Sequence, residues 1–240
     1  YVIFPDPDDW VELGYVSQMV ELQNYYQTDL LCVGYYVDTD EKCVPANEGQ
    51  KPNCMDRVTA HQALLIPPKM GGFAWNKLYH LDIIREHKLR FLDDVGTTED
   101  LEFAFHYLKY CDTVCFVPST RLYHYYQRSG AATHSEFSIK KMETIRTYEK
   151  IIESSENDKL VQAAKEEICN TAINLIWQYQ NSNLQDKAAL KKLQRYARCY
   201  LKDYLKSAQY GKGRKQQAIM ACYMPAVYAF LKNRVTKDGE

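Results

Sequence analysis

The chain has 240 residues, a formal net charge of −1, 46% hydrophobic residues, and only eight Pro and ten Gly. This composition is sufficient for a folded core and excludes a disordered chain. No apolar run reaches about 18 residues, so the sequence predicts no transmembrane helix. The near-neutral charge also gives no reason to expect a nucleic-acid partner.

The first part of the chain mixes strand and helix patterns. Apolar residues at helical spacing predict helices, and short runs of branched and aromatic residues predict strands. The expected elements are, in chain order, a strand over 1–4, a helix over about 12–26, a strand over 29–37, a polar loop over 38–57, a helix over about 76–87, a helix over about 97–110 capped by Thr97 or Thr98, and a strand over 112–118.

The second part is helical throughout from about residue 138. We therefore expect an α/β domain over 1–134 and an all-helical region over 135–240. Residues 187–237 contain 13 Lys plus Arg and a single acid, Asp203, for a net charge of +12. This asymmetry predicts either a solvated helix face or a surface that docks on an anionic membrane or a phosphate-bearing acceptor.

The eight cysteines form no C-x-x-C pair. Several lie in apolar segments, which is typical of free thiols in a reducing cytosol. Cys32, Cys43 and Cys54 could in principle bind zinc, but no matching His or fourth Cys lies at finger-like spacing. We therefore expect free thiols.

The opening segment FPDPDDW places Asp6, Asp8 and Asp9 directly after the first predicted strand. Carboxylates this close repel each other unless a counter-charge is present. A hard divalent cation, Mn²⁺ or Mg²⁺, would supply that charge and could bridge to a diphosphate. The alternative is structural, because the same residues favour a turn and a helix N-cap.

The segment TTED places Glu99 and Asp100 in the first turn of a predicted helix. The helix dipole stabilises ionised carboxylates there. One of them could act as a general base for a hydroxyl, or both could simply complement the dipole.

The segment GGFAWNKLY offers Trp75 for stacking on a sugar, and Asn76 and Lys77 as hydrogen-bond donors. The alternative is that Trp75 belongs to the core and Lys77 to the surface.

The segment YHYYQRSG contains Arg128, which could clamp phosphate oxygens. Tyr123 and Tyr125 alternate as they would on a half-buried strand. His124 or His134 could complete a metal shell, although a single histidine is usually not a ligand.

These segments, taken in order, resemble bacterial family 2 glycosyltransferases with the GT-A fold that build capsule, exopolysaccharide or lipopolysaccharide glycans. FPDPDDWV is similar to the metal-binding Asp-x-Asp stretch of that family, and WNKLY, TTEDLEF and YHYYQRSG to later landmarks. The resemblance covers about residues 1–134. It implies the C-terminal part of a GT-A mixed sheet with flanking helices, followed by a helical tail.

The resemblance also implies roles for single residues. Asp8 would bind the metal, with Asp6 near it or near the nucleotide and Asp9 in support. Asp100 would deprotonate the acceptor hydroxyl in a single displacement with inversion, and Arg128 would hold the diphosphate of the donor.

Further residues would shape the acceptor site: Trp75, Asn76, Lys77, Glu99, Tyr123 and Tyr125. The donor would be a nucleotide-diphosphate sugar, expected to be a UDP-sugar, and the acceptor a glycan or a lipid-linked glycan. The enzyme would be cytoplasmic and peripheral at the inner membrane face.

Three features depart from the family pattern. Pro5 and Pro7 flank Asp6. The Q-x-x-R-W signature of processive synthases is absent, which predicts the addition of one sugar. The nucleotide-binding opening of such domains is also absent, so we expect the chain to lack about 80 to 100 residues of a domain of ordinary size. Two alternative functions are also consistent with the sequence: a non-catalytic interaction fragment, and a glycosidase that uses paired carboxylates.

Overall fold

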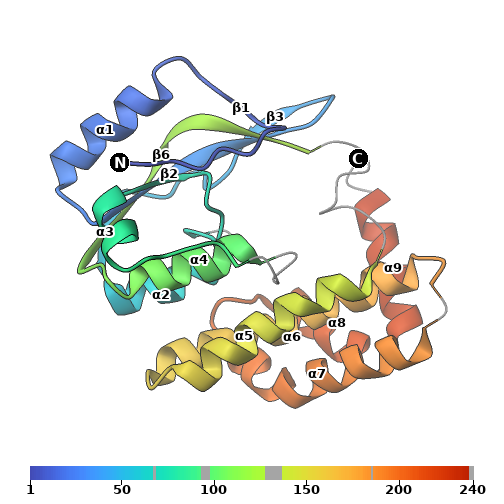
Figure 1. Cartoon of the computed structure of the whole chain (residues 1–240). Coiled ribbons are helices and arrows are strands. Elements are labelled where there is room, and N and C mark those ends of the chain that lie inside the picture. The colour runs from blue at the N-terminus through green and yellow to red at the C-terminus, as the bar shows by residue number, and fades with distance from the viewer. Residues whose placement is uncertain (67–68, 93–97, 128–136, 185, 238–240) are drawn as a thin grey trace. The chain divides into compact units, whose positions relative to one another are not determined.

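A computed structural model describes residues 1–66, 69–92, 98–127, 137–184 and 186–237 (Figure 1). The chain divides into two compact units, Tyr1–His134 and Ser135–Glu240. The first unit is a mixed sheet flanked by helices, and the described part of the second unit is helical. The expected α/β fold followed by a helical region is therefore confirmed.

The sheet of the first unit has its two longest strands at its centre. These strands, β2 (Leu30–Asp38) and β6 (Thr113–Tyr126), run parallel to each other. The other pairings are antiparallel: β1 (Trp10–Val11) and β4 (Asn53–Asp56) pair with β6, and β3 (Cys43–Pro45) and β5 (Lys77–Tyr79) pair with β2. Segments that are far apart in sequence thus meet along β6.

Helices cover both faces of this sheet (Figure 1). Helix α1 (Tyr15–Tyr26) packs on one face, where its Tyr15 and Met19 join the core cluster with Leu31 and Val33 of β2. Helices α2 (Arg57–Leu64) and α4 (Glu99–Leu108) lie on the other side, and the short helix α3 (Leu81–Glu86) follows β5. Successive strand residues face opposite sides, so β2 is buried on both faces.

A register shift bends β6 between its two halves. Val33 pairs with Val117, but the next residue, Gly34, pairs with Arg121. A Cβ atom on Gly34 would lie 2.2 Å from the carbonyl oxygen of Pro118, so only glycine fits at this close approach. The bend places the C-terminal half of β6 beside β1 and the opening acidic segment.

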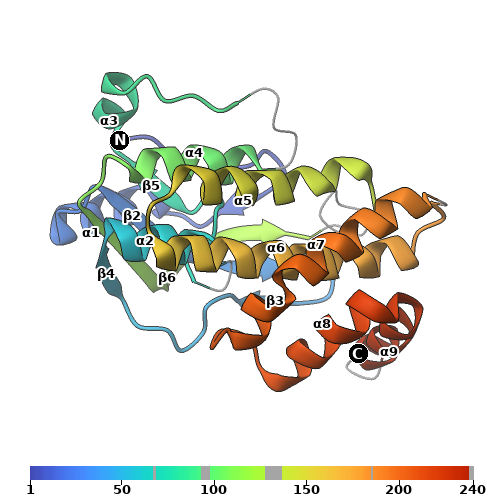
Figure 2. The same ribbon diagram turned by 90° about the horizontal axis from the view of Figure 1, so that it is seen from below.

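Helix α6 (Asp158–Gln180) is the central helix of the second unit (Figure 2). It packs against helices on several sides: α5 (Glu143–Ser154), α7 (Lys187–Lys206), α8 (Lys212–Tyr223) and α9 (Pro225–Lys237), with the short 3₁₀ helix η1 (Ile139–Met142) before α5. Within the described residues, none of the helices combines the length and the apolar character that crossing a bilayer requires.

Several expected elements were wrong in type or extent. The predicted loop over 38–57 contains β3 and β4, and the predicted helix over 76–87 begins as strand β5. Residues 1–4 contribute only an isolated bridge between Val2 and Tyr79, and helix α2 was not predicted. Strands β4 and β5 pair with β6 and β2, which are distant in sequence, so tertiary pairing overrode local preference there, whereas β3 forms a local hairpin with β2.

The expectation that all cysteines are free was also wrong. Cys54 of β4 and Cys115 of β6 are opposite each other in the antiparallel pair and form a disulfide. Six other cysteines are free thiols, of which Cys43 and Cys199 are exposed.

Candidate functional site

The opening aspartates lie in a tight turn fastened to β6. The Asp9 N–H donates to the Asp6 carbonyl oxygen at 3.3 Å, which closes the turn over Pro7 and Asp8. The turn interpretation is therefore right, whereas helix α1 begins later and has Gly14 as its N-cap. Asp8 is at the tip of the turn and is exposed.

Tyr123 holds both ends of this turn. Its hydroxyl donates to Asp9 Oδ2 at 2.6 Å and accepts the Asp6 N–H at 3.0 Å. Asp9 Oδ1 accepts the backbone N–H of Tyr126 at 2.9 Å. Both Asp9 oxygens are thus engaged by β6, so Asp9 supports the turn.

The second acidic segment begins helix α4. Thr98 is the N-cap residue, but its side chain makes no capping hydrogen bond; Thr97 is outside the described residues. Asp100 Oδ2 accepts the Ala74 N–H at 2.9 Å. Burial raises the pKa of Asp100 above its usual range, although the Ala74 N–H opposes that shift.

The two acidic segments come together in one cluster. The pKa of Asp6 is raised to about 6, first by burial and then by the nearby charges of Asp100, Asp9, Asp8 and Glu99, in that order. Glu99 Oε2 is buried and has no hydrogen-bond partner among the described residues. The buried Lys77 offsets part of the charge on Asp100, and the remaining concentration of carboxylates is a setting in which a cation binds.

The loop before β5 positions Asp100. Gly71 has a φ of 65°, a conformation that favours glycine. A Cβ on Gly72 would lie 2.7 Å from Leu101 Cδ1, so the missing side chain lets the loop lie against the first turn of α4. This close approach brings the Ala74 N–H to the Asp100 carboxylate.

Two polar side chains expected to contact a ligand are instead buried inside this loop. Lys77 is 0% exposed, and its Nζ donates to the carbonyl oxygens of Gly71 and Phe73 and to Asn76 Oδ1. Asn76 Nδ2 donates to the Val33 carbonyl oxygen at 3.1 Å. The surface alternative for Lys77 was therefore also wrong. In the structure both side chains hold the loop, and their donors are not free for an acceptor.

Trp75 belongs to the core, which was the alternative to a role in stacking on a sugar. It is 2% exposed and stacks on Tyr123, with ring centroids 4.4 Å apart, and on Tyr125, at 5.7 Å. Neither Trp75 nor Tyr123 has an exposed ring face for a sugar, and Tyr125 is only partly exposed. Tyr123 connects these stacked rings to the turn through its hydrogen bonds with Asp6 and Asp9.

Two further predicted residues, Arg128 and His134, lie outside the described residues. His124 is described and contacts none of the clustered aspartates; its Nδ1 lies 2.9 Å from Asp38 Oδ2, on a different part of the sheet. The sequence reasoning missed this contact because Asp38 was assigned to a polar loop. A hairpin pattern, with a polar turn between Asp38 and Cys43, was the available signal.

Comparisons with known proteins agree with this architecture. The chain is 30% identical over 128 residues to the Bacillus subtilis protein named "Putative glycosyltransferase EpsH", a match covering 52% of this chain and 37% of that protein. The similarity to glycosyltransferases that the sequence predicts is confirmed. No family model matches the chain.

The glycosyltransferase similarity extends to solved structures. Staphylococcus aureus TarS (residues 1–349) in complex with UDP-GlcNAc matches with a TM-score of 0.58 and 10% identity, covering 100% of this chain and 68% of that chain. The complex of the same protein with UDP matches with a TM-score of 0.52 and 9% identity, covering 100% and 67%. At these identities the structural likeness establishes the fold alone. The chain also spans well under half of EpsH.

Proposed function

We propose that this chain is the metal- and acceptor-binding part of an inverting, family 2-like glycosyltransferase. It would add one sugar from a nucleotide-diphosphate sugar to a hydroxyl of a glycan or a lipid-linked acceptor in surface polysaccharide synthesis. The observation that carries this proposal is the single cluster formed by Asp6, Asp8 and Asp100. The identity of the donor as a UDP-sugar is supported by the UDP-GlcNAc complex of the TarS fold.

The donor set of the cluster fits a hard divalent cation. Asp8 is exposed, and burial together with the nearby negative charges of Asp100, Asp9, Asp8 and Glu99 raises the pKa of Asp6. We assign Asp8 as the principal ligand of Mn²⁺ or Mg²⁺ and Asp6 as its neighbour. When bound, such an ion neutralises the charge that develops on a departing diphosphate.

We assign Asp100 as the general base. Burial raises its pKa and so makes its carboxylate a stronger proton acceptor. The Ala74 N–H occupies Oδ2 at 2.9 Å and orients the group, which leaves Oδ1 for the acceptor hydroxyl. Deprotonation of that hydroxyl as it attacks the anomeric carbon gives a single displacement with inversion.

Several assignments complete the proposal. Arg128 would hold the donor diphosphate. Glu99 adds negative charge beside Asp100, and Tyr125, partly exposed, borders the acceptor side. Asp9 and Tyr123 act as positioning residues through their mutual hydrogen bond.

The proposal is tested in the full-length gene product with a panel of nucleotide sugars and Mn²⁺. Asp100→Asn should lower turnover by about 10²- to 10⁴-fold, because proton transfer is lost. Donor affinity, measured by calorimetry, should stay within about twofold. Asp8→Ala should weaken the Mn²⁺-dependent donor binding, and Asp82→Asn, an acid on α3, is the matched control for both.

The outcomes separate the competing functions. Full turnover in Asp100→Asn would refute the base assignment, and donor affinity unchanged in Asp8→Ala would refute the metal assignment. Hydrolysis of glycosides without a metal would favour a glycosidase. A protein that binds no nucleotide sugar at all would be an interaction module.

We further propose that the basic helices of the second unit dock on the anionic inner surface of the cell membrane. Residues 187–237 carry a net charge of +12, and Lys191 and Lys192 of α7 are exposed. Vesicles containing phosphatidylglycerol should bind the chain at low salt and release it at high salt. Replacement of both Lys191 and Lys192 by Glu should reduce this binding, whereas the control Lys159→Glu should not. Absence of vesicle binding at low salt would reject the proposal.

A further inference from the structure

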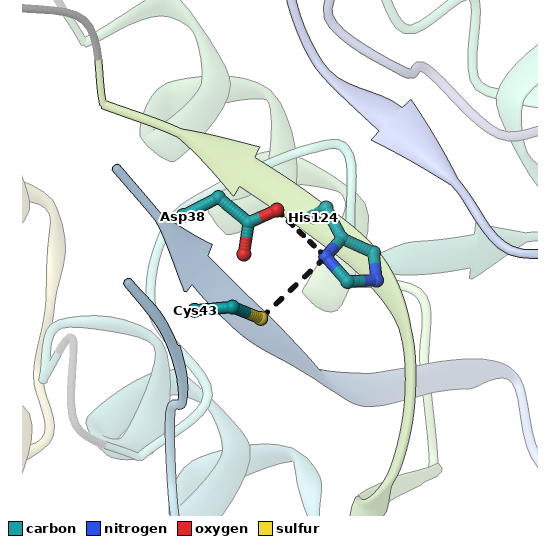
Figure 3. A group of neighbouring side chains, drawn as sticks. All are labelled: Asp38, Cys43 and His124. Carbon is teal, nitrogen blue, oxygen red and sulfur yellow. Dashed lines mark hydrogen bonds and ion pairs between the residues drawn. The ribbon is translucent and has the colours of Figure 1, made fainter. Parts of the chain in front are cut away.

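A second group of potential metal ligands lies at one end of the sheet. It consists of Asp38 at the end of β2, Cys43 at the start of β3 and His124 on β6 (Figure 3). Asp38 Oδ2 lies 2.9 Å and Cys43 Sγ 3.9 Å from the same ring nitrogen, His124 Nδ1. One ligand atom from each residue falls within 4.8 Å of the others.

The cluster is separate from the acidic cluster. His124 alternates along β6 with Tyr123 and Tyr125, so its side chain points to the opposite face of the sheet from theirs. Those two tyrosines stack on Trp75 and support the opening turn. The two groups also differ in chemistry, because sulfur and imidazole ligands favour zinc, whereas carboxylates alone favour magnesium or manganese.

The imidazole ring is held in a fixed orientation. The ring of His124 stacks on Trp10, with centroids 3.5 Å apart, and on Tyr36, with centroids 4.8 Å apart. Glu12 Oε1 lies 3.4 Å from Nε2, the nitrogen that faces away from Asp38 and Cys43. Nε2 makes no hydrogen bond among the described residues, so Glu12 acts on it through its charge, which favours a proton on Nε2 and leaves the lone pair of Nδ1 for a metal.

The backbone around the other two ligands is also fixed. Asp38 and Cys43 are paired across the β2–β3 hairpin. The turn between them is closed by the Thr39 N–H, which donates to the Lys42 carbonyl oxygen at 2.8 Å. The Asp38 carbonyl oxygen accepts the Gln127 N–H at 2.7 Å. The three ligands therefore come from three strands that hydrogen bonds already hold together.

Two observations distinguish this group from an ordinary buried ion pair. Asp38 Oδ1 is buried and has no hydrogen-bond partner among the residues that the structure describes, and Asp38 and His124 are only 8% and 4% exposed. The spacing also suits zinc: bond lengths of about 2.0 to 2.3 Å in a tetrahedron place ligand atoms about 3.3 to 3.6 Å apart. The observed 2.9 and 3.9 Å lie on either side of that range, and the third pair, Asp38 and Cys43, has ligand atoms within 4.8 Å, so side-chain adjustment without backbone movement would close the site.

We propose that Asp38, Cys43 and His124 bind a zinc ion through a carboxylate oxygen, Sγ and Nδ1. Three protein ligands leave the fourth tetrahedral position open to water. Cys43 is exposed, so the ion enters from solvent on that side. The ion joins the end of β2, the β3 hairpin and the C-terminal half of β6, and this site does not depend on the proposed sugar transfer.

The test uses the untagged chain after removal of metals, with Co²⁺ as the spectroscopic probe. In a titration, the sulfur-to-cobalt absorption in the near ultraviolet and the strong visible bands of tetrahedral coordination should saturate at one equivalent of cobalt. Zinc should displace the cobalt. Cys43→Ser should abolish the sulfur band, and Cys199→Ser, which removes the other exposed thiol, should leave it unchanged.

A second variant guards against loss of folding in the first. Asp38→Asn keeps the shape and a hydrogen-bond acceptor for His124, but it should weaken zinc binding by at least about 10- to 100-fold. Far-ultraviolet circular dichroism confirms folding of each variant. A chain that binds no cobalt, or a sulfur band that persists in Cys43→Ser, would overturn the proposal.

Discussion

Replacement of Asp6 by Asn should stabilise the metal-free chain at neutral pH. The folded state raises the pKa of Asp6 from 3.8 to about 6, chiefly through burial and then through the charges of Asp100, Asp9, Asp8 and Glu99. An acid whose pKa is higher in the folded state than in the unfolded state lowers the free energy of unfolding at every pH at which the unfolded chain ionises it. Asn has the same shape without the charge, and the hydrogen bond from the backbone N–H of residue 6 to Tyr123 remains.

The magnitude follows from the shift. A shift from 3.8 to about 6 is roughly two units, and each unit corresponds to about 1.4 kcal/mol, so the upper limit is about 3 kcal/mol. Asp6 is only partly buried, and screening by solvent lowers the expected gain to about 1–2 kcal/mol. Well below the ordinary pKa of 3.8, at about pH 3, the residue is protonated in both states, so the gain should vanish there. It should grow as the pH rises to about 6 and stay constant above.

The assay is urea unfolding in EDTA at several pH values between 4 and 8, followed by circular dichroism. Glu48→Gln is the matched control, because Glu48 is an exposed acid that is not among the charges acting on Asp6. An Asp6→Asn variant that is less stable than the parent at pH 7.5, or equally more stable at pH 4, would show that the carboxylates are not clustered as described.

Three further perturbations test the packing behind the site. Gly72→Ala should cost about 1–3 kcal/mol in urea unfolding, because its Cβ would lie 2.7 Å from Leu101 Cδ1; an unchanged midpoint would contradict that contact. Lys77→Met should cost about 2–4 kcal/mol by removing the donor to three buried acceptors, and a neutral effect by the same assay would mean that the loop can rearrange. Burial lowers the pKa of His61 below its ordinary 6.5, so the free energy of unfolding of the parent should fall as the pH drops below about 6.5, by at most about 1.4 kcal/mol per pH unit. In the same pH series, His61→Gln should lose less stability at low pH than the parent. Parallel profiles of parent and variant would exclude His61 as the cause.

In the first unit, local patterns predicted helices α1 and α4 correctly. The period of Leu101, Phe105 and Leu108 predicted α4, and α4 places Asp100 in its first turn as expected. These features depend on residues a few positions apart, where propensity and periodicity are informative. The same reasoning failed for β4 and β5, which are held by partners elsewhere in the chain, and it missed β3, which forms a local hairpin with β2.

The sequence by itself determined which residue types the site contains and in what order they occur. Only the tertiary structure decided that Lys77 is buried, because its three acceptors are set by the turn at Gly71 and the packing of Gly72 on α4. Tertiary structure likewise placed the Asp6 N–H on Tyr123, 117 residues away, and Cys43 beside His124, 81 residues away. Short-range patterns carry no information on such distances, because strand pairing and side-chain packing along β6 create those contacts after the local elements form.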